Sequence, residues 1–299
     1  MTYERFLNQA VKEIQEKLAE QGMDCKVTTA QVEKLQNQSY RGIQVWSGKD
    51  EISTSLNLTP YWERMETGSS YQLVIGEIVL EILSLLEEIP SLELGIPRTY
   101  EEIKNRLIFQ IVSSEDNREM LSHLPHMELE DMSAVLRVDL GAYPDATTTA
   151  LVTSEMMAYY GVTKEQMFDD AFKAAPLTHP AVVKRLDLLL NELSDGMFPE
   201  DENEGNPLYV ISTESECYGA AVILYPGFLE KTADELESDF FLLPSSLHEM
   251  ILVKDDGNLK AEELIQMVKE INASEVRAED KLTDSVYHYN RKKQQFCRM

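Results

Sequence analysis

The side chains best suited to chemistry lie in one short stretch. Residues 239–254 are DFFLLPSSLHEMILVK, in which Ser245, Ser246, His248 and Glu249 bring together two hydroxyls, an imidazole and a carboxylate. Nucleophilic catalysis needs a hydroxyl, a base that accepts its proton and a third group that orients the base. One hypothesis is therefore a hydrolase or transferase whose polar centre includes these four residues.

The pattern around these residues also supports a purely structural role. Apolar runs at 240–243 and 248–253 flank a Pro/Ser turn, which is typical of two neighbouring strands. Successive side chains of a strand point to opposite faces, so His248 and Glu249 would diverge, and no GxSxG motif is present. Serines in such turns commonly bond nearby backbone groups. The catalytic and structural interpretations both remain open at this point.

Metal, cofactor and phosphate sites have no local signature in the sequence. His123 and His126 are separated by Leu124-Pro125, which interrupts any helix that would align them, and no histidine has a cysteine or second histidine at ligand spacing. The GxGxxG and GxxxxGK[ST] motifs are also missing. We therefore predict neither a bound metal nor a cofactor.

Two acidic pairs fall on predicted loops. Asp139 with Asp145, and Glu214 with Glu216, have the residue type needed for acid–base catalysis. In a chain this acidic, solvated loop carboxylates are the commoner case. We therefore expect these pairs to be surface groups.

The charge balance excludes several classes of partner. The chain has 53 Asp and Glu against 27 Lys and Arg, a net charge of −26 over 299 residues. Such a chain repels phosphate backbones and anionic membranes, so direct nucleic-acid and membrane binding are not expected. It suits a protein partner with a basic surface, although the same charge can serve solubility alone.

The cysteine spacing and the N-terminal residues favour a cytoplasmic protein. Cys25, Cys217 and Cys297 are far apart and odd in number, so neither a disulfide framework nor a zinc site is indicated. The first residues are charged and lack the apolar core of a secretory signal. The longest apolar segment, residues 71–86, contains Glu77 and Glu81 and is too short to span a bilayer.

Helical and strand periodicities alternate irregularly along the chain. Apolar spacing predicts helices at 3–20, 70–88, 100–104, 116–123, 154–160, 163–175, 180–193, 228–236 and 260–271. Strand patterns lie at 25–35, 40–47, 52–58, 106–112, 133–140, 147–153, 208–213, 219–224, 240–243, 248–253 and 285–289. This order lacks regular βα alternation, so we predict an α+β fold with mixed or antiparallel sheets and packed helices.

The composition also suggests a division of the chain. Residues 195–207, DGMFPEDENEGNP, are turn formers and acids with little to bury, as in a linker. We therefore predict two subdomains, an N-terminal α+β region at 1–194 and a C-terminal α+β region at 208–299. A further division of the first region into 1–95 and 96–194 is the alternative.

Four stretches together resemble a known family. They are TYERFLNQAVKEIQ, LVTSEMMAYYGVTKEQMFDDAF, LLPSSLHEMILV and DKLTDSVYHYNRK, and PSSxHE with the VYHY ending is their most specific part. They resemble a bacterial family known as domain of unknown function 5688 over nearly the whole chain. The resemblance implies a cytoplasmic, cofactor-free protein of bacterial type and supplies no mechanism.

Two functional hypotheses follow from the sequence. We predict a non-catalytic module that binds a macromolecule, above all a protein with a basic surface. The alternative is the hydrolase or transferase centred on residues 244–249. An imidazole that meets a hydroxyl or a distant carboxylate in a pocket would favour the enzyme. The sequence does not indicate an oligomeric state.

Overall fold

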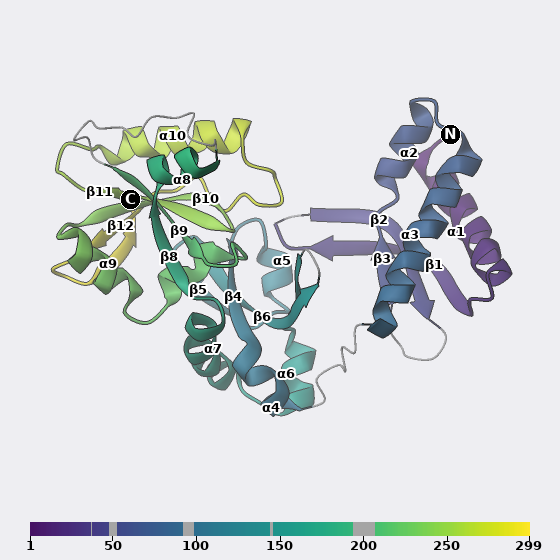
Figure 1. Cartoon of the computed structure of the whole chain (residues 1–299), viewed down its shortest axis with the longest axis horizontal. Coiled ribbons are helices and arrows are strands. Elements are labelled where there is room, and N and C mark those ends of the chain that lie inside the picture. Colours follow the sequence, from purple (N-terminus) through teal and green to yellow (C-terminus); the bar gives the residue numbers. More distant parts are fainter. Residues whose placement is uncertain (37, 48–52, 92–98, 144–145, 194–206) are drawn as a thin grey trace. The chain divides into compact units, whose positions relative to one another are not determined.

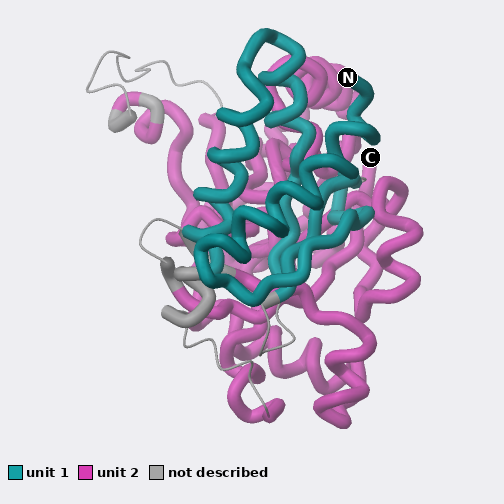
Figure 2. The backbone as a smooth tube through the Cα atoms, turned by 90° about the vertical axis from the view of Figure 1, so that its right-hand side faces the viewer, with its two compact units in different colours: residues 1–96 teal, residues 97–299 magenta. Residues whose placement is uncertain are grey.

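The computed structural model describes residues 1–36, 38–47, 53–91, 99–143, 146–193 and 207–299 (Figure 1). The chain divides into two compact units, Met1–Ile96 and Pro97–Met299 (Figure 2). Helices and antiparallel sheets are both present, and the predicted α+β class is confirmed. Among the described helices, none has the length and apolar character needed to cross a bilayer.

The first unit packs helices on a small sheet. Its elements are α1 (Tyr3–Glu20), β1 (Cys25–Lys34), β2 (Gln38–Ser47), β3 (Ser53–Leu56), α2 (Thr59–Glu66) and α3 (Tyr71–Ser91), with sheet order β1-β2-β3. One face of α1 is buried because its apolar residues recur every three or four positions. The core of this unit includes Phe6, Leu7, Ala10, Ile14, Val27, Ile43, Val45, Val74, Ile75 and Ile78.

The second unit begins with a four-stranded sheet. Strand β6 (Met132–Tyr143) pairs with β4 (Leu107–Ser113), and also with β5 (His126–Leu129) and β7 (Ala146–Leu151). The accompanying helices are α4 (Tyr100–Ile103), η1 (Lys104–Arg106), α5 (Arg118–Leu121), α6 (Ser154–Tyr160) and α7 (Lys164–Thr178). Helix α7 covers one face of this sheet, where the Phe109 ring lies 6.0 Å from Phe168 and 4.9 Å from Phe172.

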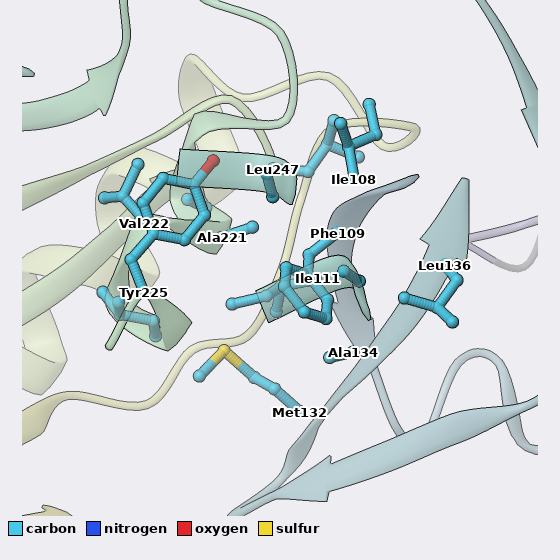
Figure 3. Packing of buried hydrophobic residues seen from close by; sticks show 14 of the residues in the cluster. Ile108, Phe109, Ile111, Met132, Ala134, Leu136, Ala221, Val222, Tyr225 and Leu247 are labelled. Carbon is cyan, nitrogen blue, oxygen red and sulfur yellow. The ribbon is translucent and has the colours of Figure 1, made fainter. Parts of the chain in front are cut away.

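A six-stranded antiparallel sheet forms the rest of this unit, in the order β13-β12-β10-β11-β9-β8. Its elements are β8 (Ala181–Arg185), α8 (Leu186–Leu193), β9 (Leu208–Thr213), η2 (Gly219–Leu224), α9 (Phe228–Leu236), β10 (Phe240–Ser246), β11 (Glu249–Lys254), α10 (Ala261–Ser274), β12 (Tyr287–Asn290) and β13 (Gln295–Arg298). One hydrophobic core joins the two sheets. In it Ala221 and Val222 of η2 gather with Ile111 of β4 and Met132 of β6 (Figure 3).

A buried polar network also ties the two sheets together. Tyr287 of β12 is fully buried, and its hydroxyl donates to Asp131 in the β5–β6 turn at 2.6 Å. Ser285 donates to the other oxygen of the same carboxylate at 2.7 Å. Burial raises the pKa of the Tyr287 hydroxyl, so it stays a hydrogen-bond donor throughout the ordinary pH range.

Two predicted elements differ from the structure. Residues 180–193 form strand β8 and then helix α8, because the β-branched Val182 and Val183 pair with β9 and this pairing overrides a helical apolar spacing. Residues 219–224 form the 3-10 helix η2 and not a strand, since periodicity cannot assign a short apolar run. Elements α2, β5 and β13 had no predicted counterpart.

The two compact units divide after Ile96, at a different place from the predicted linker. Residues on both sides of the predicted linker at 195–207 belong to the second unit, where β8 pairs with β9. The division after Ile96 instead lies beside the alternative division at 95/96. Residues 194–206 lie outside the described residues, so the linker itself stays a prediction.

Two glycines of the first unit give a matched test of its packing. A Cβ at Gly42 of β2 would collide with the backbone oxygen of Leu56, whereas one at Gly76 of α3 would meet no heavy atom within 4 Å. Gly42→Ala should therefore lower the free energy of unfolding by about 1–3 kcal/mol. Gly76→Ala should raise it by roughly 0.5–1 kcal/mol, the helix-propensity gain. Urea titrations measure both, and equal effects would contradict this packing.

Candidate functional site

The four predicted site residues lie in the turn between β10 and β11. The Ser245 hydroxyl donates to Glu249 Oε1 at 3.2 Å, and the Ser246 hydroxyl accepts from the backbone N–H of His248 at 3.0 Å. Leu247, between Ser246 and His248, is buried, and its N–H donates to the backbone oxygen of Asp280 at 2.8 Å. Both serine hydroxyls therefore stabilise the turn itself.

The His248 imidazole faces the turn between β9 and η2, away from the serines. Its Nδ1 lies 3.3 Å from the backbone nitrogen of Tyr218 and 3.1 Å from the backbone oxygen of Glu216. It can accept from the first or donate to the second, according to its tautomer. The ring stacks on the Tyr218 ring at 5.8 Å between centroids, and the side chain stays 42% exposed.

The relay of hydroxyl, imidazole and carboxylate that the catalytic hypothesis requires is not assembled in the described residues. Neither serine hydroxyl is bonded to the His248 ring, and the nearest carboxylate is Asp280, with Oδ1 3.6 Å from Nε2. That distance permits an ion pair when the ring is protonated but exceeds a hydrogen bond. The structure brings the four predicted residues into one turn without connecting them as a triad.

Gly219 allows the β9–η2 turn to approach this close. A Cβ there would collide with Ser212 Oγ and His248 O and would lie 2.7 Å from the backbone nitrogen of Thr213. The Ser212 hydroxyl donates to the same His248 oxygen at 2.8 Å, which fixes the two turns against each other. Tyr218, immediately before Gly219, has a left-handed backbone with φ of 50°. The close approach therefore places the Tyr218 ring against the His248 ring.

Arg137, which the sequence did not single out, is the second neighbour of Tyr218. In β6 it shares a sheet face with Gln110 of β4 and Thr149 of β7, because the strand registers place all three on the side opposite Phe109. Its Nε donates to Thr149 Oγ1 at 2.7 Å, Nη1 to Gln110 Oε1 at 2.9 Å and Nη2 to Thr149 O at 3.4 Å. Its Cζ lies 5.0 Å from the centre of the Tyr218 ring.

Arg137 has no acidic partner within ion-pair distance among the residues that the structure describes. All three of its recorded acceptors are neutral oxygens. Burial lowers the pKa of its guanidinium, an effect that Tyr218 and Cys217 oppose. Because an arginine starts from a pKa above 12, it stays charged at neutral pH. A positive charge is thus held at a partly buried position by neutral groups.

The pKa of the Cys217 thiol depends on its burial and on two neighbouring charged side chains, Arg137 and Asp139. Burial raises the pKa of the Cys217 thiol, Arg137 opposes this rise, and Asp139 adds to it. The thiol is therefore protonated at neutral pH and is not an activated nucleophile. Cys25, Cys217 and Cys297 are all free.

The carboxylates of the two predicted acidic pairs differ in their surroundings. Asp139 accepts from the backbone N–H of Gly141 at 2.8 Å, and its other oxygen lies 3.8 Å from Nε2 of the buried His179. Asp145 lies outside the described residues. Glu214 and Glu216 are exposed, as expected of loop carboxylates. In the described ranges no three His, Cys, Asp or Glu side chains converge to hold a metal.

Sequence patterns could have pointed to Arg137 but not to its partners. It is the one basic residue in the strand pattern AVLRVDL, whose other residues apart from Asp139 are apolar, and such a residue needs an explanation. Tyr218 and Cys217 come from a loop about eighty residues later, and no local motif connects the two segments. Only the three-dimensional fold places them together.

A comparison with protein families identifies the chain's relatives. The model of a family of unknown function, DUF5688, matches residues 3–291. The chain belongs to this family. The resemblance based on the PSSxHE and VYHY stretches is therefore confirmed. No curated protein and no solved structure matches the chain.

Alanine variants of the turn should report on stability. Ser246→Ala removes the acceptor of the His248 N–H and should lower the free energy of unfolding by about 0.5–1.5 kcal/mol. Ser245→Ala should cost less, because its bond to the partly exposed Glu249 can be replaced by water. His248→Ala loses the stacking on Tyr218 and should cost about 1 kcal/mol. Thermal melts beside the wild type measure all three, and unchanged or raised melting temperatures throughout would refute a structural role.

Proposed function

We propose that the chain is a non-catalytic binding module of the bacterial cytoplasm whose partner is a protein with a basic surface. The observation that carries this proposal is a local excess of carboxylates in the second unit. Residues 208–253 hold one Lys and no Arg, the Lys being Lys231, against the acids Glu214, Glu216, Glu230, Asp234, Glu235, Glu237, Asp239 and Glu249.

Three of these acids are exposed and lack a basic partner among the described residues. They are Glu214, Glu216 and Glu237, whereas Asp234 pairs with Arg291 at 2.9 Å and Glu235 with Lys231 at 3.7 Å. Carboxylates that no cation neutralises project a negative potential into solvent. Such a potential accelerates encounter with a basic protein and disfavours acidic ones.

The same charges argue for a protein partner over a nucleic acid. A nucleic-acid ligand would have to be held by neutralising its phosphates with Lys or Arg. The exposed acids here repel phosphates and attract lysine and arginine side chains. We therefore propose that the partner presents the basic groups.

The hydrolase or transferase alternative gains no support from the turn geometry. Its nucleophile would be Ser245 or Ser246, whose hydroxyls are bonded to Glu249 and to the His248 backbone. A base must reach the hydroxyl that it deprotonates. The described contacts place the His248 ring against Tyr218 instead.

Charge-neutralising variants test the proposal against a matched control. The triple variant Glu214→Gln, Glu216→Gln, Glu237→Gln removes the three unneutralised acids. The control Glu262→Gln, Glu263→Gln, Glu270→Gln removes the same charge from exposed positions of α10. Tagged wild type and both variants are used for affinity purification from cells that make the chain. A basic protein bound by the wild type and the control should bind the triple variant about tenfold more weakly, since each exposed pair contributes roughly 0.2–1 kcal/mol.

The salt dependence and the control decide the outcome. Binding should weaken as ionic strength rises towards about 0.15 M, where the Debye length is roughly 8 Å. Equal losses in both variants would show that only net charge matters and would contradict a defined acidic surface. Recovery of nucleic acid in place of a basic protein would overturn the proposal.

A further inference from the structure

Arg137 is bound differently from arginines whose partners are carboxylates. Arg41, Arg64, Arg291 and Arg298 each contact an acidic side chain within 3.3 Å. Arg137 is partly buried and yet its hydrogen bonds go only to neutral oxygens. Removing a charge from water is costly unless an opposite charge or hydrogen bonds compensate it. The chain has 53 acidic residues, yet none of those that the structure describes pairs with this partly buried arginine, which leaves its charge available to an external anion.

The guanidinium keeps two N–H groups for such an anion. It has five N–H donors, one on Nε and two on each terminal nitrogen. Within the described part of the chain, Nε, Nη1 and Nη2 each make one hydrogen bond, so one N–H on each terminal nitrogen has no acceptor there. Two donors on one planar group match the two oxygens of a carboxylate.

The surrounding side chains hold this group in place and leave it accessible. Thr149 and Gln110 fix the guanidinium plane, and the Tyr218 ring lies over it at 5.0 Å. His248 stacks on Tyr218 in turn, so the turn between β10 and β11 supports the arginine indirectly. Arg137, Cys217 and Tyr218 are each partly exposed, so a small molecule can reach them.

We propose that Arg137, together with Cys217 and Tyr218, binds the carboxylate group of a small molecule. This inference is independent of the proposed partner protein. Arg137 supplies one positive charge, and the negative charge of Asp139 acts on the adjacent thiol. A monoanion is neutralised by one guanidinium, whereas a dianionic phosphate leaves an excess of negative charge beside Asp139. The net charge of −26 likewise repels a dianion more strongly than a monoanion.

Titration of the full chain with acetate and benzoate tests the proposal. Ionic strength is held constant with sodium chloride, and the Nε–Hε NMR signal of Arg137 is followed. We expect a saturable shift with a dissociation constant of about 1–10 mM, the range of weak single-group contacts. Inorganic phosphate at equal concentration should shift the signal less. A linear, non-saturating response, or tighter binding of phosphate than of either carboxylate, would overturn the proposal.

Three variants distinguish a loss of ligand binding from a loss of folded protein. Benzoate binding to each is measured by calorimetry. Arg137→Lys keeps the charge, loses the planar fork and should weaken benzoate binding about tenfold or more. Arg64→Lys changes an arginine already paired with Glu77 and should leave binding unchanged. Asp139→Asn removes the nearby negative charge and should strengthen binding several-fold, which a poorly folded variant cannot imitate. Weaker benzoate binding by Asp139→Asn, or equal binding by both lysine variants, would refute the site.

Discussion

The polar region of the second unit depends on the close approach of two turns, which the missing side chain of Gly219 permits. The β9–η2 turn lies against the backbone of His248, and the Ser212 hydroxyl holds it there. The Tyr218 ring is thereby placed against both His248 and Arg137. A side chain at position 219 would separate the turns and remove the support of the guanidinium. The contact thus couples a hairpin of one sheet to a charged residue of the other.

The electrostatics of the molecule act on two length scales. At long range the net charge of −26 attracts positive groups and repels polyanions. At short range a single guanidinium sits among neutral acceptors, where the lower dielectric strengthens its attraction for a nearby charge. The two effects oppose each other for any anionic ligand. An anionic ligand is therefore favoured only when it carries little charge and contacts the guanidinium directly, because the molecule as a whole does not attract anions from a distance.

The sequence predicted the secondary structure best where one periodicity was long and uninterrupted. The predicted helix at 3–20 agrees with α1, and the predicted strands at 208–213 and 240–243 lie in β9 and β10. The prediction of a helix over 180–193 was wrong in its first half, because strand pairing with β9 outweighed the apolar spacing that favoured a helix. At the candidate site the turn itself was predictable, since Pro and Ser interrupt two apolar runs. The position of His248 against Tyr218, and that of Arg137 beneath it, required segments distant in the sequence to meet.

The bond between Asp131 and Tyr287 has a consequence for synthesis on the ribosome. Its two residues are 156 positions apart, so Tyr287 is translated long after Asp131. At roughly 5–20 residues per second, about 8–30 seconds pass between the synthesis of Asp131 and that of its tyrosine partner. The first unit, whose core uses only residues before Ile96, can form in that interval. Until Tyr287 has been translated, β12 cannot pair with β10 and Asp131 lacks its tyrosine partner, so this link between the two sheets of the second unit forms only after that interval.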